Sequence, residues 1–147
     1  MVERNEMKTA TEGFTLIELV VTITILGILA AYAYPRFASL QIEARASTVE
    51  GLAGSLRSAA ALAHSLSMVR GNPATVTMEG NNITMVNGYP DLATIDDTLN
   101  DLTGFTYAPG TGLFTKDDAT TPANCSVDYN EAAPGGSPTI VVDVFGC

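Results

Sequence analysis

The pattern of apolar and polar residues along the chain begins with one long apolar run. From Phe14 to Tyr34 the polar exceptions beside the tyrosines are Thr15, Glu18, Thr22 and Thr24. As a helix, this stretch would be about 30 Å long, which matches the hydrocarbon core of a bilayer. The run therefore predicts a membrane-spanning helix.

A cleaved secretory signal peptide is the alternative for this run. A signal peptide has a shorter apolar region, followed by a site of small residues. Here the run is long and rich in β-branched residues, and Ala31-Tyr32-Ala33 is the nearest candidate for such a site. The pattern favours a helix that stays in the mature protein.

The apolar spacing stays helical after Pro35. The residues that recur at steps of three and four are Leu52, Leu56, Ala59, Ala63 and Leu66. Gly71-Asn72-Pro73 then supplies the glycine and proline that commonly end a helix. The spacing predicts one helix from about Thr15 to Arg70, interrupted at Pro35. A single domain cannot bury so long a rod, so its first half needs lipid or other copies of the chain.

Beyond Arg70 the apolar pattern alternates, as in strands. TVTME and ITMVN flank a turn at Gly80-Asn81-Asn82, and FTY and LFT flank one at Ala108-Pro109-Gly110. CSVDY and TIVVDVF are further strands, and DLATIDDTLNDL is predicted as a short helix. We expect an α+β fold in which helix 36–70 packs on a small antiparallel sheet within 74–147.

Charge is concentrated in the second half of the chain. Residues 71–147 contain ten acidic residues and one basic residue, Lys116, which gives a formal charge of −9. An acidic surface of this kind repels nucleic-acid backbones, so no nucleic-acid partner is expected. Asp117, Asp118 and Asp128 are a calcium-site hypothesis, although they lack the spacing of an EF-hand loop.

Two cysteines, Cys125 and Cys147, lie late in the chain. They form no CxxC motif, and with His64 as the single histidine, zinc ligation by side chains is disfavoured. A disulfide formed in an oxidising compartment would stabilise the fold by roughly 3 kcal/mol. The alternative is a pair of buried free thiols.

Catalytic motifs are missing from the sequence. It contains no G-x-S-x-G and no glycine-rich phosphate loop, and the neighbours His64 and Ser65 do not face each other on a helix. We therefore expect neither an enzyme nor a cofactor. Glu18 remains the unusual group, because a carboxylate in an apolar helix is costly. It either serves a function there or reaches back to the membrane interface.

The segment EGFTLIELVVTITILGILAAYAYPRF resembles the N-terminal signature of type IV pilins. The resemblance implies that residues 1–13 are a leader cut after Gly13, and that Phe14 becomes an N-methylated terminus. Glu18 matches the acidic residue of the family, and Gly27 and Pro35 match its helix-weakening positions. The implied segments are a leader 1–13, a membrane or filament-core helix 14–35 and a pilin head 36–147.

Later parts of the chain extend this resemblance. Cys125 and Cys147 resemble the C-terminal disulfide loop of pilins, here 125–147. PRFASLQIEARASTVEGLAGSLRSAAALAHS, with GYPD later, is similar to the mannose-sensitive haemagglutinin branch. The leader departs from the usual basic pattern, since it contains Glu3, Glu6 and Glu12. Translation from Met7 would give a leader closer to the usual form.

The resemblance implies a structural subunit of a helical surface filament, with roles in adhesion, surface attachment or twitching motility. Its implied partners are identical subunits, a prepilin peptidase that also methylates, and the inner-membrane assembly platform. The subunit would wait in the inner membrane, head outside, and become extracellular on assembly. A pseudopilin of a type II secretion system shares the motif, and a membrane-anchored monomeric binding protein is a third reading.

The resemblance also gives Glu18 a role. Cleavage after Gly13 would create a cationic amine on Phe14, and that amine could meet Glu18 of a neighbouring subunit. A buried pair of this kind would fix the register of the subunits, because any slip would strand two charges in an apolar core.

Overall fold

A computed structural model describes residues 13–147 of the chain. The expected leader, apart from Gly13, and the alternative start at Met7 lie outside these residues. Contacts divide the chain into two units, Met1–Ser39 and Leu40–Cys147. The first unit contains the apolar run, and the second contains both sheets and the disulfide.

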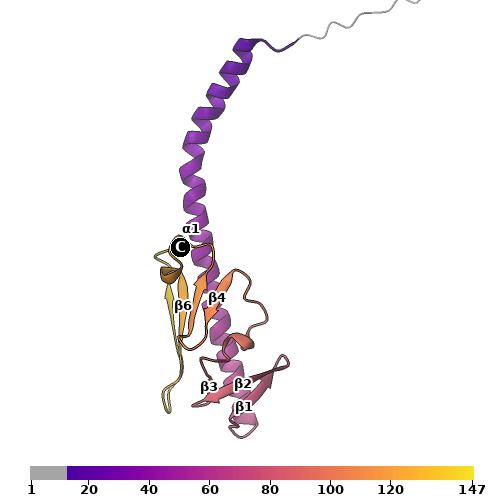
Figure 1. The fold of residues 1–147 in the computed structure, drawn as a ribbon, viewed down its shortest axis with the longest axis vertical. Coiled ribbons are helices and arrows are strands. Elements are labelled where there is room, and N and C mark those ends of the chain that lie inside the picture. The colour runs from indigo at the N-terminus through magenta and orange to yellow at the C-terminus, as the bar shows by residue number, and fades with distance from the viewer. Residues whose placement is uncertain (1–12) are drawn as a thin grey trace, which may run out of the picture. The chain divides into compact units, whose positions relative to one another are not determined.

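The main helix, α1, extends from Leu16 to Val69 and remains helical through Pro35 (Figure 1). It begins with a capping box, in which the Thr15 backbone N–H and hydroxyl each donate to Glu18 Oε2 at 2.8 Å. The Glu18 backbone N–H in turn donates to Thr15 Oγ1 at 3.3 Å. These bonds satisfy groups that a helix start otherwise leaves unpaired.

The end of α1 confirms the stop signal that the sequence places there. Gly71 adopts φ +80°, a left-handed conformation that suits glycine. The Asn72 N–H donates to Ser67 O at 2.8 Å, and the Gly71 N–H donates to Met68 O at 3.2 Å. This pair of bonds is the Schellman motif, which satisfies the last carbonyl groups of a helix.

A three-stranded antiparallel sheet follows the helix. Its strands are β1 (Thr75–Met78), β2 (Asn81–Val86) and β3 (Tyr89–Pro90), in that order. The first turn lies one residue earlier than expected, at Glu79-Gly80, where φ is 49° and 89°. Two positive φ angles define the two-residue turn whose twist matches the paired strands, and this geometry fixes the register.

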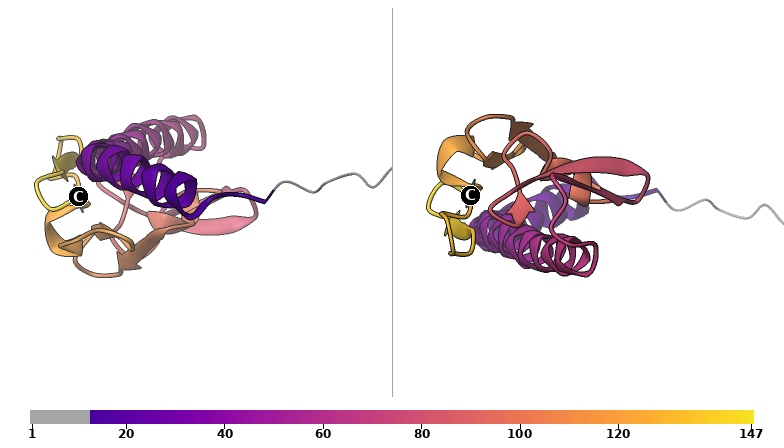
Figure 2. Two further views of the ribbon diagram at one scale, coloured as in Figure 1. Left: turned by 90° about the horizontal axis from the view of Figure 1, so that it is seen from above. Right: turned by 90° about the horizontal axis from the view of Figure 1, so that it is seen from below.

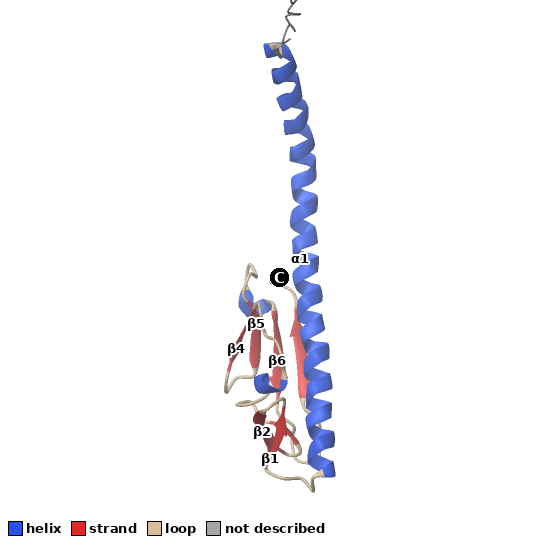
Figure 3. Ribbon diagram, turned by 90° about the vertical axis from the view of Figure 1, so that its right-hand side faces the viewer, coloured by secondary structure: helices blue, strands red, loops and turns tan. Residues whose placement is uncertain are grey.

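A separate four-stranded antiparallel sheet completes the head. It contains β4 (Phe105–Ala108), β5 (Leu113–Lys116), β6 (Ser126–Asn130) and β7 (Thr139–Asp143), paired in chain order (Figure 3). The hairpin around Ala108-Pro109-Gly110 and the two later strands are therefore confirmed. The α+β class is confirmed as well, although the strands form two sheets.

The expected helix in DLATIDDTLNDL is reduced to a single 3₁₀ turn, η1 (Asp96–Thr98). Asp91 Oδ1 accepts hydrogen bonds from the backbone N–H and the hydroxyl of Thr94, at 2.9 and 2.6 Å. Asp101 accepts the same two bonds from Thr103. Such local side-chain bonds compete with helical hydrogen bonds, which explains the irregular backbone. A second 3₁₀ turn, η2, spans Pro122–Asn124.

The core of the head lies between the two sheets and the C-terminal part of α1. The strands of both sheets lie on one side of that part of the helix (Figure 2). Leu56, Ile95, Phe114, Val127 and Tyr129 are fully buried there. A smaller cluster joins Ala63 of α1 to the β1–β2 hairpin. The helical stripe predicted over Leu52–Leu66 is thus the face that α1 buries in its own head.

Candidate functional site

The apolar segment is the first part of the candidate site. Every large apolar side chain from Phe14 to Leu29 is exposed, with exposed fractions between 43% and 92%. By length and composition this part of α1 could cross a membrane, and none of the relevant stretch is buried within the chain. The segment therefore presents an apolar surface that the described residues of the chain do not cover.

Glu18 lies on this apolar surface. Phe14, Ile17, Val21 and Thr22 line a shallow hollow with it. Its carboxylate has hydrogen-bond partners within its own helix, because Thr15 donates to it twice. This capping role is one that the sequence interpretation missed. The pattern Thr15-x-x-Glu18 is the signal that would have revealed it.

Gly13 and Phe14 precede the first turn of α1. Phe14 is 92% exposed, and a side chain added at Gly13 would meet nothing within 4 Å. The peptide bond between them is thus unobstructed by the described part of the chain. Its cleavage and the methylation of Phe14 stay predictions.

Gly27 and Pro35 lie in the exposed stretch of α1. A side chain added at Gly27 would also meet nothing within 4 Å, so no neighbouring group requires glycine there. Glycine lowers helix stability by about 1 kcal/mol relative to alanine, and proline removes one backbone hydrogen bond. Both positions therefore weaken a helix region that is exposed in the described part of the chain.

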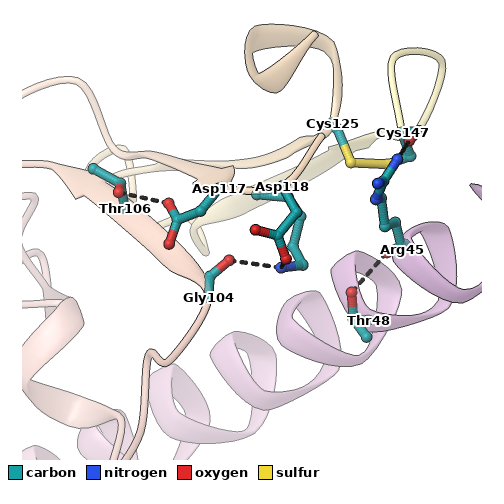
Figure 4. Close-up of polar contacts among 9 residues, drawn as sticks. Arg45, Thr48, Gly104, Thr106, Asp117, Asp118, Cys125 and Cys147 are labelled. Atoms are coloured by element: carbon teal, nitrogen blue, oxygen red, sulfur yellow. Dashed lines mark hydrogen bonds and ion pairs between the residues drawn. A yellow bond between two sulfur atoms is a disulfide. The ribbon is translucent and has the colours of Figure 1, made fainter. Parts of the chain in front are cut away.

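The disulfide loop is the second part of the candidate site. Cys125 and Cys147 form the predicted disulfide, with their Cα atoms 4.8 Å apart and both residues buried. Arg45 of α1 donates from Nη1 to Cys147 O at 2.9 Å (Figure 4). The tail is therefore attached to the head by a covalent bond and to α1 by a charge-assisted hydrogen bond.

Close backbone packing holds the same loop. The Gly146 N–H donates to Asn124 O at 2.7 Å, and its carbonyl accepts from the Thr121 N–H at 3.1 Å. A Cβ atom at Gly146 would lie 2.6 Å from Thr121 O. Only glycine fits at this position without a shift of the backbone.

Lys116, the single basic residue of the acidic half, points inward. Its side chain is 11% exposed, and Nζ donates to Gly104 O at 2.9 Å and lies 3.4 Å from Asp118 Oδ2. Asp117 accepts a bond from the Thr106 hydroxyl at 2.7 Å. Within residues 13–147 no group of three or more acidic, histidine or cysteine side chains could hold a metal. The structure therefore does not bring Asp117, Asp118 and Asp128 together as calcium ligands.

Two tyrosine hydroxyls of the four-stranded sheet donate to the backbone in and just after β3. Tyr129 of β6 donates to Pro90 O of β3 at 2.7 Å, and Tyr107 of β4 donates to Leu92 O. Burial, with the nearby Asp96 carboxylate second, raises the pKa of Tyr107 to about 12. Burial likewise raises the pKa of Tyr129. Both hydroxyls stay protonated near neutral pH and act as donors.

His64 is a partly buried histidine of α1. Its Nδ1 lies 2.7 Å from Gly88 O. Its ring stacks on Tyr89 with centroids 4.2 Å apart and an angle of 4° between the planes. Sequence alone could not find this contact, because Tyr89 lies on a different element.

Comparison with known proteins adds to this geometry. Residues 9–34 match the model of the prokaryotic N-terminal methylation motif. The chain is also similar to the type IV narrow pilus major component PilA5 of Thermus thermophilus, with 50% identity over 52 residues, which are 35% of this chain. The chain spans less than half, 45%, of that relative. No solved structure matches the chain.

The motif match indicates a class of protein in which an N-terminal methylation signal includes the start of an apolar helix. Within that class, the similarity to a pilus component and the α+β fold with one long helix support a type IV pilin.

Proposed function

We propose that this chain is the structural subunit of a type IV pilus. The observation that carries the proposal is the exposed apolar surface of residues 14–35, which coincides with the methylation motif. A soluble monomer rarely exposes a large apolar surface, so this one needs lipid or a protein partner. Before assembly, membrane lipid covers this apolar surface. In the filament, the same segment of other copies covers it.

Processing comes before assembly in this proposal. A prepilin peptidase cuts between Gly13 and Phe14 and methylates the new amine of Phe14. The motif match across both residues supports this step, and so does the open surrounding of Gly13. The amine stays cationic near neutral pH, since an α-amino group has a pKa of roughly 7.7–8.0.

Glu18 then has two successive partners. Before assembly its carboxylate is held by Thr15, which satisfies it without a second charge. In the filament the Phe14 amine of a neighbour approaches the same carboxylate and forms a buried pair. Breaking such a pair costs about 3–5 kcal/mol, so the pair selects one axial register of packed helices.

The two parts of the chain have different roles in this proposal. Residues 14–35 serve as the membrane and filament-core helix, and residues 36–147 form the pilin head outside the inner membrane. The partners are identical subunits, the processing peptidase and the assembly platform. Adhesion, surface attachment and twitching motility are the roles such a filament serves. Between Gly27 and Pro35 we expect the helix to unwind locally during assembly.

The test is intact mass combined with electron microscopy of filaments sheared from cells that express this chain as their only pilin. We expect filaments whose subunit begins at Phe14 and carries one added methyl group. Subunits that still contain Gly13 would overturn the processing step. A chain found only as a monomer in the membrane fraction would overturn the filament proposal.

A further inference from the structure

Two adjoining hollows lie on the head, where α1 faces the β2–β3 turn and the segment before β7. One, of about 500 Å³, is lined by His64, Asn87, Tyr89 and Ser137 among others. The other, of about 200 Å³, is lined by Arg57, Tyr89 and Ser137 among others. Tyr89 and Ser137 line both hollows, so the two lie side by side, and together they are called here the Arg57–His64 groove.

Arg57 and His64 face this groove together because of helix geometry. They are seven positions apart, which is close to two full turns of an α-helix and about 10 Å along its axis. The two side chains therefore project from the same face of α1. The β2–β3 turn, where Asn87 and Gly88 adopt φ angles of 52° and 86°, brings Gly88 O to within 2.7 Å of His64 Nδ1.

Arg57 is a cation with unused donors. Its one hydrogen bond is a long contact of 3.5 Å from Nη2 to Ile140 O. In residues 13–147 the one ion pair is that of Lys116 with Asp118, so no described carboxylate neutralises Arg57. A guanidinium group in this state offers the planar pair of donors that binds a carboxylate in a bidentate manner.

The aromatic part of the groove is held in place. Gly88 O can only accept a hydrogen bond, so His64 Nδ1 carries the proton in their 2.7 Å contact. The stacking of His64 on Tyr89 fixes the plane of both rings. Asn87 donates from its amide nitrogen to Ala132 O at 2.8 Å, which leaves its side-chain oxygen available to a ligand hydroxyl.

We propose that the Arg57–His64 groove binds a small ligand that carries a carboxylate on a ring. The carboxylate pairs with Arg57, the ring lies against the edge of the His64–Tyr89 stack, and hydroxyl groups reach Asn87 and Ser137. The larger of the two hollows, of about 500 Å³, lies within the ordinary range of small-molecule sites, about 300–1,000 Å³. The guanidinium of Arg57 also provides a local positive charge for the ligand carboxylate, in a chain whose formal net charge is −9.

Two kinds of small molecule carry a carboxylate on a ring in this way: acidic sugars and aromatic acids. All residues of the groove belong to the unit Leu40–Cys147, so binding needs no filament. The proposal therefore does not rest on the pilus function, and an unassembled chain can test it.

The experiment is an amide NMR titration of the full chain in detergent micelles. The probes are digalacturonate and 4-hydroxybenzoate, each with its neutral counterpart, galactobiose or 4-hydroxybenzamide. We expect saturable shifts at Gly88, Gly135 and Ser137 with at least one carboxylate probe, and about tenfold weaker binding of its neutral counterpart. The probe that binds identifies the source as sugar or aromatic acid.

Variants locate the site. Arg57→Gln should weaken binding about tenfold, and Arg57→Lys, which keeps the charge and loses the planar donor pair, should have a smaller effect. Arg70→Gln removes an exposed arginine directly after the end of α1, outside the groove, and should leave affinity within about twofold. Unchanged amide shifts elsewhere in the head show that each variant is folded. The proposal is wrong if neither carboxylate binds, if neutral probes bind equally well, or if Arg57→Gln and Arg70→Gln behave alike.

Discussion

The two ends of α1 share one secondary structure and differ in how that structure is covered. Leu26, in the first unit, is 62% exposed, whereas Leu56, in the second, is fully buried. Both are ordinary helix-forming leucines, so helix propensity does not separate them. The difference lies in what packs on each of them: the two sheets cover the face of Leu56, whereas no residue of the described range 13–147 buries Leu26.

This difference shows what each region requires. A helix that is apolar on all sides is buried in protein or lipid, and the stretch from Leu16 to Leu29 has this composition. The region near Leu56 has a buried stripe beside exposed small and charged residues, such as Ser55 and Arg57. The head therefore buries its apolar face within the chain, whereas the first region leaves its apolar residues exposed among the described residues.

The largest expected effect comes from Glu18→Gln, which removes the charge from the uncovered region. Glutamine preserves the capping box with Thr15, so the helix start and the head should be unchanged. The Phe14 amine of the neighbouring subunit would lose its counter-charge, and this loss would recur at every subunit of the filament. We expect sheared filaments to decrease by about tenfold or more while the membrane pool of subunit stays normal.

The matched control for this variant is Glu50→Gln, which removes an exposed carboxylate in the head-bearing part of the same helix. Filament yield should stay normal with this change. Abundant filaments from Glu18→Gln would show that charge does not align the subunits.

A paired leucine truncation tests the comparison directly. Leu56→Ala should destabilise the head by about 2–5 kcal/mol, because the cavity forms in a closed core. Leu26→Ala should leave the stability of the head unchanged. Urea unfolding of the detergent-solubilised chain, followed by tyrosine fluorescence, measures both. Equal losses would mean that the head depends on the first region.

The disulfide accounts for part of the independence of the head. Replacing Cys125 and Cys147 by serine should lower its free energy of unfolding by roughly 3 kcal/mol in the chain-entropy model. Non-reducing peptide mapping of the unchanged protein should recover the two cysteines linked, and free thiols in exported protein would contradict this. Arg45→Gln, which keeps the bond and removes the contact to Cys147 O, should have a smaller effect of about 1–3 kcal/mol.

The smallest effect is expected at the helix start. Thr15→Ala removes the capping hydroxyl and should destabilise the first turn of α1 by about 1 kcal/mol, whereas Thr15→Ser should keep the bond. Amide hydrogen exchange of residues 16–19 in micelles measures the difference. Equal exchange in the two variants would show that Thr15 does not hold Glu18 in solution.

Much of this architecture was predictable because it depends on neighbours in the sequence. The apolar run, the stop at Gly71 and the hairpin around Pro109 all follow from side-chain periodicity and local backbone preferences. The pairing of Cys125 with Cys147 followed because the chain contains two cysteines. The apolar run from Phe14 to Leu29 depends almost wholly on such local preferences, since no distant residue of the described part of the chain buries it.

Tertiary structure alone decided the features that join distant segments. It separated the strands into two sheets, placed the ammonium of Lys116 against Gly104 O, and stacked His64 on Tyr89. It also requires glycine at position 112, where a Cβ atom would lie 2.0 Å from Tyr129 O. The physical reason is that alternating strands carry similar local patterns, so their partners are chosen by the packing of the whole head. By itself the sequence determined that α1 forms and where it ends. Only the packing of the head determined which part of that helix the sheets cover.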